Sequence, residues 1–112
     1  MKHFALALAG LAFLSVAAVS AQDPKLVDAG KQLFSSKQCT KCHQVAGRGN
    51  KANNLDGVAS KVSPADMGKW LTNPTEMEAK LDHKPKIKMS SKKASLSGSD
   101  IDALLAYLQT LK

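Results

Sequence analysis

Two cysteines and a histidine stand together in this sequence, in the run Cys39-Thr40-Lys41-Cys42-His43. Their spacing is C-x-x-C-H, which is the pattern for covalent attachment of a c-type haem. Two thiols three positions apart can each form a thioether with one vinyl group of the same porphyrin, and the adjacent imidazole can bind the iron. Because the haem would carry the redox chemistry, the rest of the chain is expected to house it.

The same cysteines allow two other interpretations. A structural zinc site needs a closed shell of four ligands, but the sequence has no second C-x-x-C, and beyond His43 only His83 remains after the N-terminal segment. A redox dithiol of the thioredoxin kind is expected near a βαβ pattern, which the sequence does not show, and it leaves His43 without a role. Haem attachment is the interpretation that uses all three residues.

The N-terminal segment has the features of a secretory signal peptide. Lys2 stands near its start, an apolar run covers residues 4–19, and Val19-Ser20-Ala21 places small residues at the two positions that signal peptidase inspects. We expect cleavage after Ala21, so that residues 1–21 are removed. The remaining residues 22–112 would form one periplasmic domain without a transmembrane span.

The expected mature domain is small and basic. It has three aromatic residues, Phe34, Trp70 and Tyr107. A core of this size gives only marginal stability unless a covalently attached group such as a haem adds to it. The formal net charge of the whole chain is +7, and without Lys2 it is +6. Such a charge favours acidic partners or anionic membranes. Nucleic acid is not expected, because the lysines are not interleaved with aromatic residues.

Helix starts are marked by capping residues. Asp23, Ser63 and Asn73 each precede a proline, a pattern that predicts helices over residues 24–36, 64–72 and 74–81. A last helix is predicted after Ser97, because its apolar residues recur at helical intervals up to Leu111. No strand pattern is present, and the polar residues 82–95 are predicted to form a loop. We therefore expect an all-α domain of three to five helices wrapped round one haem.

This order of parts resembles a class I cytochrome c of the small bacterial kind. The resemblance covers almost all of residues 22–112. Besides the C-x-x-C-H motif, it rests on Gly30 and Phe34, Asn54-Leu55-Asp56-Gly57, Lys88-Met89 and Ala106-Tyr107-Leu108. It implies the small cytochrome c fold, in which the first and last helices cross closely. Gly30 would permit that approach, and Phe34 would pack near Tyr107.

The resemblance implies His43 and Met89 as the axial ligands of the haem iron. Met67 and Met77 could also offer a thioether, but they lie in predicted helices and suit core packing. Met89 lies in a polar segment, where an apolar side chain has no evident structural purpose, and it occupies the ligand position of the family. His83 is the alternative ligand, since bis-histidine haems also occur.

Three further contacts follow from the resemblance. The family usually has a proline whose carbonyl accepts a hydrogen bond from the ligating histidine. Asn53 stands at this position, and its backbone carbonyl could serve in the same way. Trp70 and Lys61 stand where they could contact the haem propionates, although core packing of Trp70 and simple solvation of Lys61 are alternatives.

The function predicted from these residues is a soluble, monomeric one-electron carrier and not an enzyme. With both axial positions filled, the iron of haem c can only cycle between Fe(III) and Fe(II), among respiratory or periplasmic redox enzymes. Redox partners with acidic docking surfaces are expected to meet the lysines near the motif and near Met89. The alternatives are a ligand-binding sensor or small peroxidase with an open iron position, and a docking subunit of a larger oxidoreductase.

Overall fold

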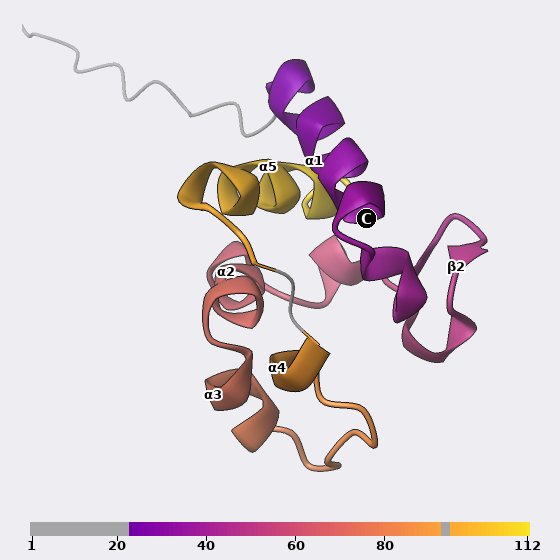
Figure 1. Cartoon of the computed structure of the whole chain (residues 1–112), viewed down its shortest axis with the longest axis vertical. Coiled ribbons are helices and arrows are strands. Elements are labelled where there is room, and N and C mark those ends of the chain that lie inside the picture. The colour runs from indigo at the N-terminus through magenta and orange to yellow at the C-terminus, as the bar shows by residue number, and fades with distance from the viewer. Residues whose placement is uncertain (1–22, 93–94) are drawn as a thin grey trace, which may run out of the picture.

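The computed structural model of the chain describes residues 23–92 and 95–112 (Figure 1). The predicted signal peptide, residues 1–21, lies outside the described residues. The helices are α1 (Pro24–Ser36), α2 (Pro64–Thr72), α3 (Pro74–Ala79), α4 (Met89–Lys92) and α5 (Gly98–Leu108). Three short 3-10 turns are η1 (Cys39–Lys41), η2 (Lys51–Asn53) and η3 (Val58–Ser60). Within the described part of the chain, no helix has the length and apolar character needed to cross a membrane.

The predicted capping residues begin the helices as expected. The side chains of Asp23, Ser63 and Asn73 each accept a hydrogen bond from a backbone N–H in the first turn of the helix that follows. Ser97 and Asp100 form a reciprocal capping box at the start of α5. The predicted bounds of α1 and α2 are confirmed. The third helix ends at Ala79 and the last at Leu108, each short of its predicted end.

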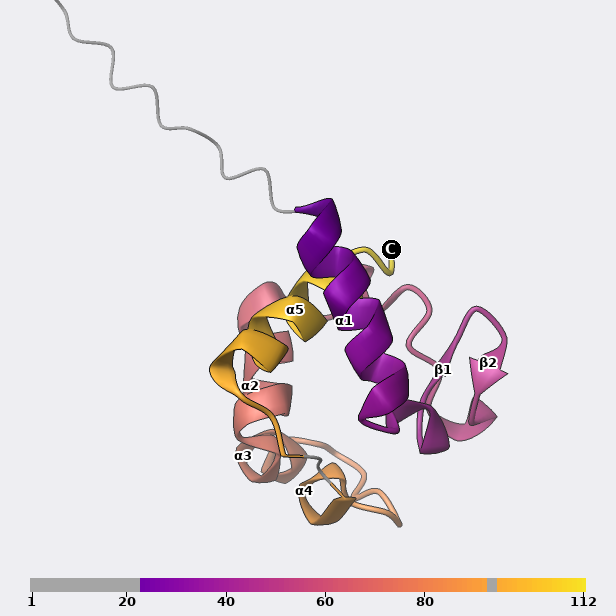
Figure 2. The same ribbon diagram turned by 45° about the horizontal axis from the view of Figure 1, so that its top comes forward.

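The core of the domain forms where α1 crosses α5. The two helices lie against each other in both views (Figures 1 and 2), and Gly30 of α1 faces the backbone of Ala103 in α5. The rings of Phe34 and Tyr107 pack edge to face, with centroids 5.8 Å apart. The close crossing and its aromatic pair are therefore confirmed. The buried core cluster consists of Phe34, Val45, Met67, Leu71, Leu104, Tyr107 and Leu108.

A small hairpin corrects the expectation that the chain has no strands. Strand β1 (Gln44–Val45) pairs antiparallel with β2 (Arg48–Gly49). The two residues between them, Ala46 and Gly47, have φ angles of 50° and 79°, which is the pattern of a type I′ hairpin turn. Strands of two residues are too short to show an alternating pattern, so the sequence did not predict them. The described fold is otherwise helical, as expected.

Helix α4 corrects the prediction of a loop over residues 82–95. Its first turn is held from outside, because the backbone N–H and the hydroxyl of Ser90 both donate to the carboxylate of Glu78 in α3. Helices α3 and α4 lie side by side in both views (Figures 1 and 2). A contact between residues twelve positions apart has no local signature, so capping and periodicity could not predict it.

Candidate haem-binding site

The C-x-x-C-H motif folds into one tight turn directly after α1. Helix α1 ends where Gln38 adopts a left-handed conformation, with a φ of 61°, and the chain enters η1 at Cys39. The backbone N–H groups of Cys42 and His43 both donate to the carbonyl oxygen of Cys39, over 3.1 and 2.9 Å. Because a 3-10 turn has three residues per turn, Cys39 and Cys42 lie on the same side of it. One planar ligand could therefore reach both thiols.

The imidazole of His43 has a buried nitrogen without a partner. Nδ1 is buried and has no hydrogen bond among the described residues. Burial lowers the pKa of His43, while the nearby Asn53 backbone raises it. A histidine with a lowered pKa favours the neutral ring, which is the form that binds metal ions. The Asn53 backbone is thus near enough to the ring to affect its pKa, but a hydrogen bond from Nδ1 to the Asn53 carbonyl oxygen stays a prediction.

Gly49 and Asn50 hold the motif turn in place, and sequence reasoning missed both. The backbone N–H of Asn50 donates to the carbonyl oxygen of Thr40, and its side-chain amide donates to that of Lys41, each over 3.1 Å. Gly49 has a φ of 104°, and a Cβ there would overlap the carbonyl oxygen of His43. The Gly-Asn pair indicates a turn, but no sequence signal shows that the turn packs on the motif.

The two thiols differ from ordinary surface cysteines. Cys39 and Cys42 are both half-buried and free, and Cys39 packs against the core cluster. Burial raises the pKa of the Cys39 thiol, its backbone hydrogen bond lowers it, and the neighbouring Cys42 raises it slightly. The site therefore offers two free thiols, one of them beside an apolar surface, which suits addition to the vinyl groups of a porphyrin.

The methionine candidates for the second axial ligand occupy different environments. Met67 and Met77 are buried, with 4% and 8% of their surfaces exposed, as expected for core residues. Met89 is half-buried at the start of α4 and packs against the core cluster. In both views the hairpin that follows α1 lies at the right of the molecule and α4 at the bottom (Figures 1 and 2).

The remaining predicted site residues lie in less enclosed positions. His83 is exposed in the segment between α3 and α4. Lys61 is exposed directly after η3, while Trp70 is half-buried within α2. The burial of Trp70 suits either a core role or contact with a bound group, so its propionate contact stays a prediction, as does that of Lys61.

Glu78 is a buried carboxylate that the sequence did not indicate. It is buried near the end of α3, with 8% of its surface exposed. Hydrogen bonds from the backbone and then the side chain of Ser90, with the charge of Lys88, hold the pKa of Glu78 below its usual value although burial raises it. The carboxylate therefore stays ionised beside the segment that carries Met89.

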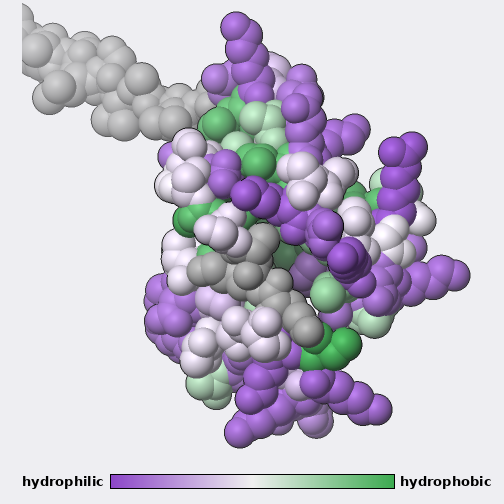
Figure 3. All heavy atoms as spheres, in the orientation of Figure 1, coloured by the Kyte–Doolittle hydropathy of each residue, from purple (hydrophilic) through white to green (hydrophobic). Residues whose placement is uncertain are grey.

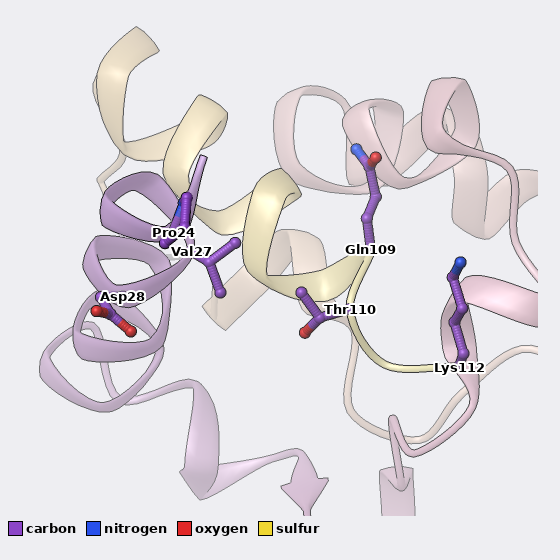
Figure 4. Close-up of a pocket in the computed structure, with 6 residues that line it drawn as sticks. All are labelled: Pro24, Val27, Asp28, Gln109, Thr110 and Lys112. Atoms are coloured by element: carbon purple, nitrogen blue, oxygen red, sulfur yellow. The ribbon is translucent and has the colours of Figure 1, made fainter. Parts of the chain in front are cut away.

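One pocket on the described part of the chain is separate from these residues. It has a volume of about 370 Å³ and lies between the start of α1 and the end of α5 (Figure 4). It is open to solvent, and the residues that line it are Pro24, Val27, Asp28, Gln109, Thr110 and Lys112. None of the predicted haem residues is among them, so this pocket is not the candidate site.

A helical domain with C-x-x-C-H folded into a single turn after its first helix defines a small haem-binding protein. Comparison with known families agrees: the family described as Cytochrome c matches residues 27–112. The chain therefore belongs to the cytochrome c family. Its cofactor is one covalently bound haem c, and this sets aside both the zinc and the dithiol interpretations.

Two curated relatives share this domain. The chain is 30% identical over 93 residues to the Cbb3-type cytochrome c oxidase subunit CcoP of Helicobacter pylori (strain 52), and equally to a CcoP subunit of Helicobacter pylori. Each match covers 81% of this chain but only 30% of the relative, so the chain corresponds to under a third of those proteins. No solved structure matches the chain. Membership of the family supports electron transfer by haem.

The described residues fit this cofactor. Two thiols lie on one side of a single turn, and the next residue offers an imidazole with a buried, unpartnered nitrogen. Both the Cys39 end of the site and Met89 pack against the same apolar cluster. This donor set, two thiols with one imidazole and one thioether, is one of the sets that can hold a covalently bound, six-coordinate haem.

Proposed function

We propose that this protein is a soluble one-electron carrier in which Cys39 and Cys42 bind the haem covalently and His43 and Met89 bind its iron. The observation that carries the proposal is that Cys39 and Met89 pack against one core cluster, although one follows α1 and the other begins α4, fifty residues later in the sequence. A group bound between these segments would therefore have one protein ligand on each face. When bound, the haem supplies a reversible one-electron couple between Fe(III) and Fe(II).

The protein residues set the properties of that couple. The His43 imidazole and the Met89 thioether would occupy both axial positions and so exclude exogenous ligands, and a thioether favours the ferrous state and raises the potential. The Asn53 carbonyl would accept a hydrogen bond from His43 Nδ1 and orient the ring. Trp70 and Lys61 would contact the propionates. With no open iron position, these groups support electron transfer rather than substrate turnover.

Docking with redox partners would use the exposed lysines. Lys84, Lys86 and Lys88 are exposed in the segment that leads to Met89, and Lys41 is exposed within the motif. Hydrophilic side chains extend round most of the outline of the face in Figure 3, where hydrophobic residues form only small separate patches. A positive surface of this kind steers acidic partners toward the haem edge. Carrier and partner would then form a short-lived electrostatic complex.

We also propose that the protein acts in the periplasm as a monomer. The proposal rests on the predicted signal peptide of residues 1–21, which would leave residues 22–112 as the mature domain. N-terminal sequencing of the exported protein should begin at Gln22, and its mass in solution should be that of one chain with one haem. A protein that keeps its first 21 residues would contradict this part of the proposal.

A second function is favoured by the relatives. Both are named as subunits of a cytochrome c oxidase, so this domain could instead serve as a docking subunit of a larger oxidoreductase. Purification from native membranes under mild conditions distinguishes the two. Recovery of the haem protein alone supports the free carrier, whereas stable co-purification with an oxidoreductase supports the subunit.

The decisive test of the carrier proposal is a combined spectroscopic and ligand-binding experiment. Absorption spectra of the ferric and ferrous holoprotein, with a potentiometric titration, should show a low-spin haem c and one reversible one-electron step. Carbon monoxide added to the reduced protein at neutral pH should bind slowly and incompletely. Rapid and complete binding would mean an open iron position, and would favour the sensor or peroxidase alternative.

A further inference from the structure

Helix α4, which carries Met89, is too short to be stable alone. It has four residues, Met89–Lys92, and isolated helices of fewer than about 12 residues are marginal in water. Among the described residues, the hydrogen bonds of Ser91 stay within the segment: its backbone N–H and its hydroxyl both donate to the carbonyl oxygen of Lys88. These bonds shape the turn but cannot position it relative to the core. The position of Met89 must therefore depend on contacts from outside α4.

Glu78 supplies such a contact with both of its carboxylate oxygens. Oε1 accepts from the backbone N–H of Ser90 over 2.8 Å, and Oε2 accepts from the Ser90 hydroxyl over 2.8 Å. Ser90 is the second residue of α4, where a backbone N–H has no partner inside its own helix. A negative charge at a helix N-terminus is favourable. The Glu78 carboxylate thus accepts a hydrogen bond from a backbone N–H that has no partner within α4, and it joins α4 to α3.

The helix that carries Glu78 is itself fixed to the core. In α3, Pro74 and Met77 are buried, and Asn73 caps the first turn. Helix α3 also packs against α2, whose Met67 and Leu71 belong to the core cluster. A continuous set of contacts therefore runs from the core through α3 and Glu78 to Ser90, the residue next to Met89. The burial of Glu78 is explained by this role, since a carboxylate removed from water must be hydrogen-bonded.

We propose that Glu78 is the positioning residue for the Met89 thioether, because its two hydrogen bonds to Ser90 hold α4 where Met89 can stay on the haem iron. This inference rests on Met89 being the axial ligand, as proposed above. Glu78 touches neither the iron nor a substrate, and acts through the backbone of α4. A thioether binds ferric iron less strongly than ferrous iron. Loss of the hydrogen bonds between Glu78 and Ser90 should therefore release Met89 from the iron first in the ferric state.

The test uses three variants of the full holoprotein. Glu78→Ala removes both hydrogen bonds, whereas Glu78→Gln keeps an acceptor for the Ser90 N–H and can donate to the Ser90 hydroxyl. Glu76→Ala is the control, because it removes a negative charge from the same helix at an exposed position. Its ion pairs to Lys69 and Lys80, and the hydrogen bond that it accepts from the Asn73 side chain, all lie on the surface. The readouts are the midpoint potential, the affinity of the ferric protein for imidazole and the rate of carbon monoxide binding to the ferrous protein.

Glu78→Ala should bind imidazole roughly 10- to 100-fold more tightly than the wild type, the effect expected when a charge-assisted hydrogen bond is lost. Its midpoint potential should fall, and its carbon monoxide binding should accelerate. Glu78→Gln should restore most of the wild-type behaviour, and Glu76→Ala should match the wild type. If Glu78→Ala does not form a stable holoprotein, Ser90→Ala is used in its place. It removes one of the two hydrogen bonds and should show the same changes to a smaller extent.

The outcomes separate this inference from the proposed function. Suppose that Met89→Ala changes the potential and ligand binding, while Glu78→Ala, or Ser90→Ala in its place, changes neither. Met89 is then still the axial ligand, but the positioning role of Glu78 is wrong. If Met89→Ala also leaves both unchanged, the proposed ligation is wrong and the inference falls with it. If Glu78→Gln is as impaired as Glu78→Ala, the charge rather than the hydrogen-bond geometry acts, and the proposal is overturned in the form given.

Discussion

Gly30 and Tyr107 meet where α1 crosses α5, so closely that a Cβ at position 30 would lie 2.7 Å from the Cβ of Tyr107. The same Cβ would overlap the backbone carbonyl oxygen of Ala103. A backbone atom cannot rotate away as a side chain can, so any larger residue must push the helices apart. This crossing supports the end of α1, from which the chain enters the haem-binding turn.

Gly30→Ala is therefore expected to destabilise the holoprotein by about 2 kcal/mol, within the range for overpacking, although alanine is the better helix former by about 1 kcal/mol. Gly68→Ala in α2 is the control, because its Cβ would meet only Leu105 Cδ1, at 3.9 Å. That variant should gain roughly 0.5–1 kcal/mol. Denaturant unfolding measures both, and equal shifts in the free energy of unfolding would contradict the close-approach argument.

Met89→Ala should keep its covalent haem but bind carbon monoxide readily and have a lower midpoint potential, because a thioether raises the potential of haem iron. Met77→Ala should change both properties less than Met89→Ala does, while losing about 2–5 kcal/mol of stability, since Met77 is buried in the core. His83→Ala, at an exposed position, should change neither the stability nor the potential. The ligand assignment would be wrong if His83→Ala or Met77→Ala shifted the potential and Met89→Ala did not.

Replacing both Cys39 and Cys42 by alanine should yield little stable holoprotein after export. The thioethers anchor the haem, and a domain of this size depends on such a staple for its stability. Haem staining of denaturing gels, with thermal unfolding of whatever protein is recovered, measures the effect. Recovery of a folded, haem-free double variant with the thermal stability of the wild type would show that the core does not need the haem.

Electron transfer to an acidic redox partner should slow steeply as salt is added. Steering raises association rates by roughly 10–1000-fold at low ionic strength, and the Debye length falls from ~30 Å at 0.01 M to ~10 Å at 0.1 M salt. Lys86 and Lys88 are exposed close to Met89, whereas Lys25 and Lys112 lie near the chain ends. Charge reversal of the first pair should slow stopped-flow electron transfer more than reversal of the second.

Two results would count against this docking surface: an electron-transfer rate that does not respond to salt, or one equally sensitive to charge reversal of both lysine pairs.

Lys37 is expected to contribute less to partner docking than its position beside the motif implies. It is half-buried and lies 3.9 Å from Asp100, at the start of α5. Its charge is thus partly neutralised by Asp100.

Tyr107 should make the protein less stable at alkaline pH. Burial, and then the charge of Asp56, raise the pKa of Tyr107 above its usual value. Below pH ~10 the phenol is protonated in both the folded and unfolded chains, so it has no effect there. Above that pH the unfolded chain ionises first, and stability falls by at most about 1.4 kcal/mol per pH unit until the folded pKa is passed. Tyr107→Phe should show a shallower alkaline loss in denaturant unfolding, and an unchanged slope would refute the burial argument.

Local sequence was enough to predict the parts of the fold that depend on neighbouring residues. Asp23 and Pro24 are adjacent, Ser97 and Asp100 are three positions apart, and the C-x-x-C-H motif spans five residues, so their geometry follows from a single turn of chain. Periodicity likewise indicated the core faces of α1 and α5. The crossing of these helices could be expected only from the family resemblance.

The tertiary structure alone placed Asn50 on the haem-binding turn and Glu78 on Ser90. The bond from Asn50 to Lys41 spans nine positions, and the bonds from Ser90 to Glu78 span twelve. The intervening segments are irregular and polar, and they carry no repeat that would show which way they fold back. A carboxylate in a helix with exposed acidic neighbours looks like any solvated charge in sequence. Only when α3 and α4 pack together does its burial make hydrogen bonding to the start of α4 energetically necessary.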